Sequence, residues 1–325
     1  MTKVEKVAGM DISKDFFDVC FISGRCEKAG RFTNDTKGFE QFCAWISAGI
    51  HCVMEVTGPY YLRVATYLHG KGFSVSVVNP LVIKRFSQMR LIRAKTDKAD
   101  ARMIALYGLS EALQLWSPPN DCITALQQLD SISAQLSKQR TALNNQLEAF
   151  RQSGAVQKQI KQFLIKAIRI AQKQQACIEK QMDDLVKKHY AEMMKNLTSI
   201  PGLGKKAAMV LIVLTGGFKK FASAKQLSAY VGLAPRIFQS GSSVKGKARI
   251  CKMGMSRIRV LLYLCAWSAK RCNQACKDLY ERLVSKGKAK RVALIAVANK
   301  LIKQAFAIIN NNTTYKKNYS KNICL

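Results

Sequence analysis

Residues 120–195 contain no proline and a single glycine, Gly154, and prolines stand at positions 118, 119 and 201 on either side of them. Apolar residues recur there at three- and four-residue steps: Leu129, Ile132, Leu136, Leu143, Leu147 and Phe150, then Val156, Ile160, Phe163, Ala167 and Ile178. This spacing predicts two long helices that break at Gly154. These helices form either an antiparallel coiled-coil hairpin or part of the core of a helical bundle. Both interpretations stay open, because one sequence does not say whether the apolar face that packs against this one belongs to the same chain.

The residues before this helical stretch alternate strand and helix signals. Short β-rich runs are Val4–Met10, Phe16–Ile22, Gly30–Thr33, Cys52–Val56 and Gly72–Val78, the last closed by Asn79 and Pro80. Helices are expected from Asn34 or Asp35 to Trp45, from Tyr60 to His69, and from the N-cap Thr96 to Leu109. The order predicts an α/β domain with a mixed sheet flanked by helices.

Composition shifts divide the chain into four predicted parts. They are the α/β domain at 1–115, a helical connector at 116–195, a mainly helical C-terminal domain at 196–310, and a basic tail at 311–325 that is expected to be disordered.

Charge is distributed very unevenly along the chain. Lys and Arg number 53 against 20 Asp and Glu, a formal net charge of +33, while 48% of residues are hydrophobic. From Met193 to Lys277 there are sixteen Lys and Arg and no acid. A folded chain with this charge calls for a polyanion. The longest apolar run, Ala207 to Leu214, is too short for a bilayer, so nucleic acid is favoured over a membrane.

The cysteines argue against a zinc site or a disulfide framework. Eleven cysteines are scattered without a C-x-x-C pair, and the chain has three histidines. Reduced, mostly buried thiols in a cytoplasmic protein are the expected state.

Four carboxylates in the N-terminal half are the candidate catalytic and metal-ligating residues. Asp11 and Glu55 end predicted strands, and Asp97 and Asp100 share one face of a predicted helix. Singly, Asp11 could start a turn and Asp97 could stabilise a helix N-terminus. Together, four converging acids call for Mg²⁺ or Mn²⁺, as two ions about 3.5–4 Å apart in phosphoryl transfer. Nearby cations expected to meet nucleic-acid phosphates are Lys84, Arg85, Arg93 and Lys95.

Two basic segments of the C-terminal half are candidate nucleic-acid contacts. The run Ile200-Pro-Gly-Leu-Gly-Lys resembles a helix-hairpin-helix turn, with Gly202, Gly204 and Lys205 at a phosphate, or is an ordinary interhelical turn. A second segment holds Arg236, Lys245, Lys247, Arg249 and Arg257 around a Ser-Gly loop. That loop is either a flexible phosphate-binding turn or the carrier of a serine nucleophile, Ser240, with Ser242 and Ser243 as lesser candidates.

Several short motifs follow one another in a fixed order. They are Gly9-Met-Asp-Ile-Ser-Lys, Met54-Glu-Val-Thr-Gly, Asn79-Pro, Ala94-Lys-Thr-Asp-Lys-Ala-Asp-Ala, Ile200-Pro-Gly-Leu-Gly, Gly232-Leu-Ala-Pro, Gln239-Ser-Gly and Lys252-Met-Gly-Met-Ser-Arg-Ile-Arg. The set resembles the transposases of the insertion sequence 110 family over residues 4 to 270. The stretch Met253-Gly-Met-Ser departs from many relatives, which leaves the subgroup open.

This resemblance implies a fold, a site and partners. It implies an RNase H-like (RuvC-like) domain with an Asp-Glu-Asp-Asp tetrad at Asp11, Glu55, Asp97 and Asp100, a coiled-coil connector, and a catalytic serine at Ser240. It also implies dimers that pair into tetramers, with a composite site from two subunits, and a structured non-coding guide RNA in some members.

The resulting prediction is a cytoplasmic, nucleoid-associated prokaryotic DNA recombinase that moves an insertion element. Two alternatives remain open at this point. A metal-dependent junction nuclease would attack with water in place of Ser240, and a non-enzymatic packaging protein would need none of the four acids.

Overall fold

The protein is represented by a computed structural model. It describes residues 5–47, 49–56, 58–92, 96–154, 157–236, 239–240, 244–245, 249–251 and 253–317. The chain divides into two compact units, Met1–Pro119 and Asn120–Leu325. The predicted connector and C-terminal domain therefore fall within one unit.

A five-stranded mixed sheet forms the centre of the first unit, in the order β3-β2-β1-β4-β5. Three antiparallel strands are β1 (Lys6–Ile12), β2 (Phe16–Ser23) and β3 (Cys26–Thr33), and β4 (His51–Glu55) and β5 (Ser74–Val78) add in parallel to β1. This arrangement confirms the predicted mixed sheet.

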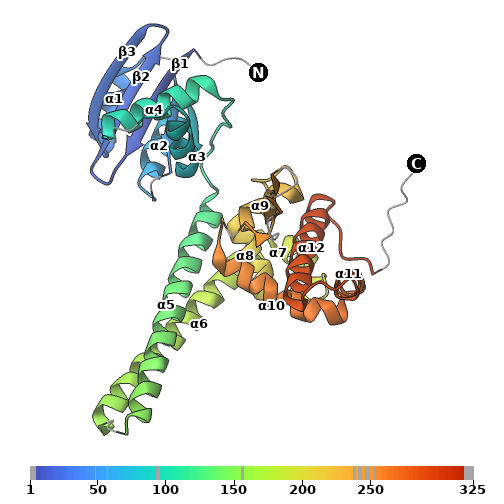
Figure 1. Ribbon diagram of the computed structural model, residues 1–325. Helices are drawn as coiled ribbons and strands as arrows, with labels where there is room; N and C mark the ends of the chain where they lie inside the picture. Colours follow the sequence, from blue (N-terminus) through green and yellow to red (C-terminus); the bar gives the residue numbers. More distant parts are fainter. Residues whose placement is uncertain are drawn as a thin grey trace, which may run out of the picture. The chain divides into compact units, whose positions relative to one another are not determined.

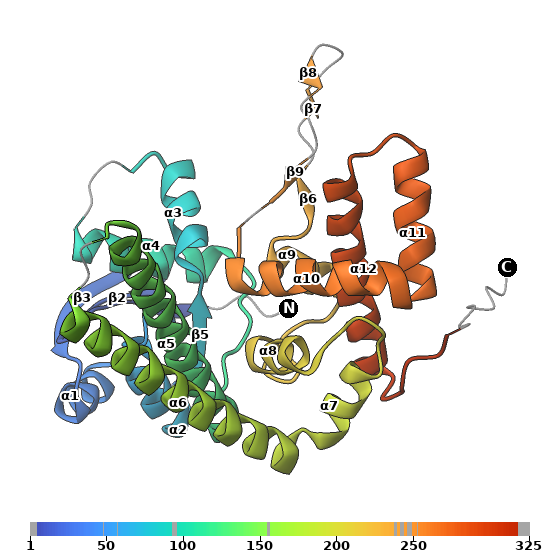
Figure 2. The same cartoon turned by 90° about the horizontal axis from the view of Figure 1, so that it is seen from below.

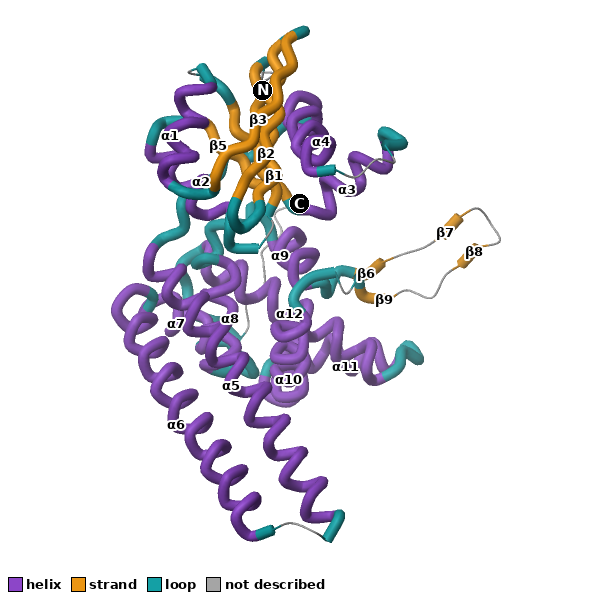
Figure 3. The backbone as a smooth tube through the Cα atoms, turned by 90° about the vertical axis from the view of Figure 1, so that its left-hand side faces the viewer, coloured by secondary structure: helices purple, strands orange, loops and turns teal. Residues whose placement is uncertain are grey.

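Helices cover both faces of this sheet. The faces are separate because alternate residues of a strand point to opposite sides. Figure 3 shows α1 (Thr36–Trp45) and α2 (Tyr61–Gly70) on one side, and α3 (Pro80–Met89) and α4 (Asp97–Ser110) on the other. Even-numbered residues of β1 pack toward α1 and α2, whereas Val7 and Val53 pack toward α4.

Local capping signals account for most of the predicted helices. Asp35 accepts a hydrogen bond from the Gly38 amide, and Thr96 accepts one from the Ala99 amide, so both predicted N-caps are confirmed. One helix was missing from the prediction. Asn79 and Pro80 do not simply close β5: Asn79 caps α3 by accepting from the Leu81 amide, and Pro80 is its first residue.

Helix α4 lies close to the sheet because each side of the interface has a glycine, Gly9 on β1 and Gly108 on α4. A Cβ on Gly9 of β1 would come within 2.2 Å of the Ala105 nitrogen, and one on Gly108 of α4 within 2.8 Å of Val7. This close approach fixes the height of α4, and with it the height of its first turn, above the end of β1.

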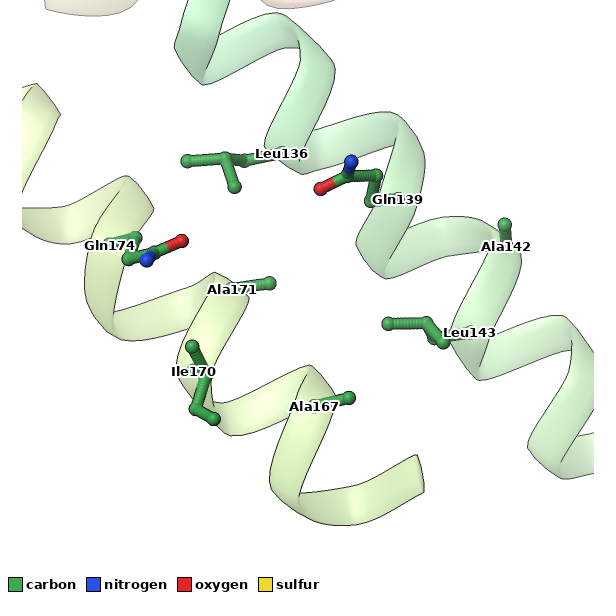
Figure 4. A pocket seen from close by; sticks show the side chains of 8 residues that line it. All are labelled: Leu136, Gln139, Ala142, Leu143, Ala167, Ile170, Ala171 and Gln174. Atoms are coloured by element: carbon green, nitrogen blue, oxygen red, sulfur yellow. The ribbon is translucent and has the colours of Figure 1, made fainter. Parts of the chain in front are cut away.

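Two long helices begin the second unit. Helices α5 (Asp121–Gln152) and α6 (Lys158–His189) lie side by side (Figure 1), and Gly154 follows α5 with φ +70°, so the predicted break is confirmed. Between them runs an apolar groove of about 470 Å³. Figure 4 shows Leu136 and Leu143 of α5 facing Ala167 and Ala171 of α6.

Six further helices follow in the described part of the second unit. They are α7 (Ala191–Thr198), α8 (Lys205–Thr215), α9 (Ala224–Val231), α10 (Ser256–Cys272), α11 (Gln274–Ser285) and α12 (Lys290–Asn310). One apolar core joins α8, α10 and α12 to the base of the α5–α6 pair.

Two strand pairs lie between α9 and α10. The pairs are β6 (Pro235–Arg236) with β9 (Arg249–Ile250), and β7 (Gln239–Ser240) with β8 (Val244–Lys245). Figure 2 shows β7 and β8 farther from the helices than β6 and β9.

Two smaller predictions need correction. In the predicted disordered tail, Tyr315 is held by a hydrogen bond from its amide to the Ser199 hydroxyl (2.8 Å) and from its own hydroxyl to Asn273 (3.1 Å). Tyr315 of the predicted tail therefore contacts the helical part of the unit, and residues 318–325 of that tail lie outside the described residues. The described cysteines are free, as expected, but Cys20, Cys52, Cys122 and Cys276 are buried whereas the others are partly or fully exposed.

Candidate active site

Strand register places two of the four predicted acids side by side. The parallel pairing of β1 with β4 sets Met10 opposite Met54, so Asp11 and Glu55 occupy the next matched positions. Both share the parity of Val7 and Val53, which pack under α4, and therefore point to the α4 face of the sheet. Neighbouring strands are about 4.8 Å apart, which is close enough for two carboxylates to share one cation.

The first turn of α4 brings the other two acids to the same end of this face. Burial, followed in order of size by the carboxylates of Asp100, Asp97 and Asp18, raises the pKa of Asp11 from 3.8 to about 6. These Coulombic effects require the acids to lie near one another. The structure thus gathers Asp11, Glu55, Asp97 and Asp100 on one sheet face.

A fifth acid and an arginine belong to this cluster and were missing from the prediction. Asp18 of β2 lies directly opposite Asp11, and Arg31 of β3 lies directly opposite Asp18. The Arg31 guanidinium donates to Asp18 and, at 2.8 Å, to Asp97. The sequence did carry a signal: Asp18 interrupts the apolar run Phe16–Ile22 on the face shared with Asp11.

The donor chemistry of this cluster suits a hard divalent cation. Carboxylate oxygens are the ligands that Mg²⁺ and Mn²⁺ prefer. The spacing is wider than that of a closed cage: within the described residues, no three His, Cys, Asp or Glu side chains are close enough to hold a metal ion. The residues therefore fit a metal in the kind of donor atoms they offer, whereas their spacing in this structure is wider than metal ligation requires.

The predicted phosphate-binding turn of the second unit has two glycines with different roles. Gly202 has φ +93°, and a Cβ there would meet the Ala269 backbone of α10 at 2.6 Å, so this glycine is needed for packing. Gly204, before α8, faces open space. Lys205 is paired with Asp183 of α6, so its ammonium is partly neutralised.

The other predicted nucleic-acid contacts differ in exposure. Lys84, Arg85, Arg236 and Arg249 are exposed. Arg257 instead forms an ion pair with Asp130, a buried acid of α5, which favours a packing role. For Lys245 the structure describes only the backbone, which lies in β8. Arg93, Lys95 and Lys247 lie outside the described residues.

The predicted nucleophile lies on a different unit from the acids. The backbone of Ser240 pairs with Val244 in the β7–β8 ribbon. Ser242 and Ser243 lie outside the described residues. Two glycines hold the base of this segment: a Cβ on Gly232 would meet the Met253 carbonyl at 2.6 Å, and one on Gly254 would meet the Tyr230 carbonyl at 2.2 Å.

Comparison with known proteins covers nearly the whole chain. Residues 8–152 match a family described as a transposase, and residues 194–281 match the transposase IS116/IS110/IS902 family. The pilin gene-inverting protein of Moraxella bovis is 34% identical over 95% of this chain and 97% of its own length. The chain belongs to the IS110 family of transposases.

Two further relatives of this transposase place it among DNA-rearranging proteins. The pilin gene-inverting protein of Moraxella lacunata is 33% identical over 95% of this chain and 97% of the relative. The transposase for insertion sequence element IS1111A of Coxiella burnetii (strain RSA 493 / Nine Mile phase I) is 24% identical over 96% and 91%. Family membership makes the chain an enzyme, a DNA transposase or recombinase, and overturns the non-enzymatic packaging alternative.

One helix of this transposase has the length and composition of a membrane span. Among the described residues this is α12, of which half of the most apolar stretch is buried inside the unit. The apolar residues of α12 do not form one uninterrupted run in the sequence, because Lys300 and Lys303 lie among them. A core helix passes the same test, so α12 is a weak indication of a membrane.

Proposed function

We propose that this transposase is a Mg²⁺-dependent, site-specific recombinase that moves an insertion element through a covalent serine–DNA intermediate. The observation that carries the proposal is the gathering of Asp11, Glu55, Asp97 and Asp100 at one end of the α4 face. A mixed five-stranded sheet with acids at the ends of β1 and β4 supports an RNase H-like (RuvC-like) domain.

The four acids would hold the divalent cation, and the basic residues would position the DNA. A bound Mg²⁺ or Mn²⁺ supplies charge neutralisation at the phosphate. Ser240 Oγ attacks the phosphorus and gives its proton to solvent water, and the bond from phosphorus to the departing strand's oxygen breaks. That oxygen takes up a proton. The phosphoserine ester retains the phosphodiester energy for joining to a new strand.

Loss of the covalent adduct tests this chemistry directly. With radiolabelled element-end DNA and Mg²⁺, Ser240→Ala should abolish the denaturation-resistant protein–DNA adduct while nucleic-acid binding persists. Asp11→Asn should lower adduct formation by about 10²-fold or more. Cleavage that survives in Ser240→Ala but not in Asp11→Asn would replace this proposal with the junction nuclease, in which water attacks. An adduct that survives would move the nucleophile to Ser242 or Ser243.

We also propose a guide RNA and a paired assembly of subunits in the cytoplasm, at the nucleoid. The acid-free stretch from Met193 to Lys277 supports RNA and DNA binding together. The exposed apolar groove between α5 and α6, with Phe163 72% exposed nearby, supports a coiled-coil contact with a second copy. Purification without nuclease treatment, followed by sequencing of bound RNA, tests the guide.

A further inference from the structure

A row of three charged residues crosses the sheet beside the acid cluster. Asp11 of β1, Asp18 of β2 and Arg31 of β3 are direct cross-strand partners, so their side chains stand on the α4 face. Asp97, in the first turn of α4, meets the end of this row through Arg31. The arginine therefore connects an acid that is not part of the predicted tetrad to one that is.

Arg31 holds its two partners very unequally. To Asp18 it makes three contacts, from Nε to both carboxylate oxygens (3.1 Å each) and from Nη2 to Oδ2 (2.8 Å). To Asp97 it makes one, from Nη2 at 2.8 Å. The Asp18 side chain is 9% exposed and that of Asp97 is 66% exposed. The Asp18 bond is thus a multidentate anchor, and the Asp97 bond is single and open to solvent.

We propose that Arg31 is a positioning residue that holds Asp97 through one hydrogen bond while it stays anchored to Asp18, and that releases Asp97 when a divalent cation binds. This arrangement is called the latch below. The inference rests on the proposed metal site. A cation needs the Asp97 oxygen that Arg31 holds, and the single exposed bond can break while the Asp18 anchor stays intact. Arg31 also places a positive charge beside the acids and so opposes a second positive charge there.

This arrangement fixes the sign of the effect on metal affinity. Removing Arg31 frees Asp97 and makes the cluster more negative, and both changes favour a cation. Binding of Mn²⁺ to Arg31→Ala should therefore be tighter than to the wild type, by about three- to tenfold. Arg31→Lys keeps the charge and should stay within about twofold of the wild type.

Isothermal titration of the full-length protein with Mn²⁺ alone measures these affinities. The matched control is Arg102→Ala. Arg102 also ties α4 to β3, through a 2.8 Å pair with Glu27 of similar exposure, but it does not touch the tetrad. Removing it deletes the same charge from the same face and should leave the affinity within about twofold. Tighter binding in Arg31→Ala alone supports the latch; unchanged or weaker binding overturns it.

A second variant covers the case in which Arg31→Ala does not fold because Asp18 is left buried without its partner. The double variant Asp18→Asn with Arg31→Gln removes one negative and one positive charge, so the net charge of the cluster is unchanged. Any change in affinity then reports only that Arg31 no longer competes with the cation for Asp97. Its affinity should rise in the same direction, and no rise overturns the latch. Wild-type binding that Asp11→Asn abolishes establishes the metal site independently. If the wild type shows no such Mn²⁺ binding, both the proposed metal site and the latch are overturned.

Discussion

Asp11 experiences two unfavourable influences in the folded protein, burial and three neighbouring carboxylates. Together they raise its pKa from 3.8 to about 6. An acid whose folded pKa lies above its unfolded pKa binds protons more tightly when folded. Its effect on stability is therefore neutral below about pH 4, and becomes a penalty as the pH rises through 6.

Replacing this carboxyl should stabilise the protein at alkaline pH. Asp11→Asn should raise the free energy of unfolding in the absence of divalent ions by about 1–2 kcal/mol at pH 8, after allowance for partial exposure. The gain should shrink through pH 6 and vanish below about pH 4. Denaturant titrations across this range measure it. Asp15→Asn, an exposed acid in the β1–β2 turn, is the control, and an equal gain there would contradict the assignment.

Among the elements, α4 has the most exacting placement. Its N-cap Thr96 fixes where the helix begins, and Gly9 and Gly108 let it approach the sheet at close range. Because Asp97 and Asp100 lie in the first turn, the height of α4 sets their distance from Asp11.

A methyl group at Gly9 should disturb the site and the fold together. Gly9→Ala would collide with backbone atoms of α4, which cannot rotate away, so we expect a loss of about 2–4 kcal/mol in the free energy of unfolding and of most adduct formation. Gly70→Ala, at the end of α2 with nothing within 4 Å of the new methyl, should change either quantity little. Equal stability of the two variants in chemical denaturation would show that α4 has room to move.

At the scale of the whole molecule, the predicted metal-binding acids and the predicted serine nucleophile belong to different units. Asp11 belongs to the unit ending at Pro119, and Ser240 to the unit beginning at Asn120. A composite site in trans would draw the acids from one subunit and the serine from another.

Mixing two inactive variants tests the composite site. If subunits exchange, half of random dimers of Asp11→Asn and Ser240→Ala are mixed, and each has one intact site of two. The adduct should then return to about a quarter of the wild-type level. A site formed within one subunit would give none. Each variant alone serves as the control, and gel-based quantification of adduct is the measurement.

The sequence by itself determined the features that depend on neighbours along the chain. Capping by Asp35 and Thr96, the break at Gly154, the strand and helix order and the acid-free basic stretch all follow from short-range patterns. The positions of Asp11 and Glu55 at the ends of predicted strands were also enough to identify them as candidate site residues. The helix at Pro80 was missed because Asn79 and Pro80 serve equally as a strand stop and a helix start.

Tertiary structure decided which charges meet. The cross-strand row of Asp11, Asp18 and Arg31 depends on register, and the pairing of Arg257 with Asp130 joins residues far apart in sequence. Sequence spacing does not contain these pairings, because they arise only once strands align and helices pack. The physical reason is that a carboxylate's partner is chosen by distance in space, which the folded core sets.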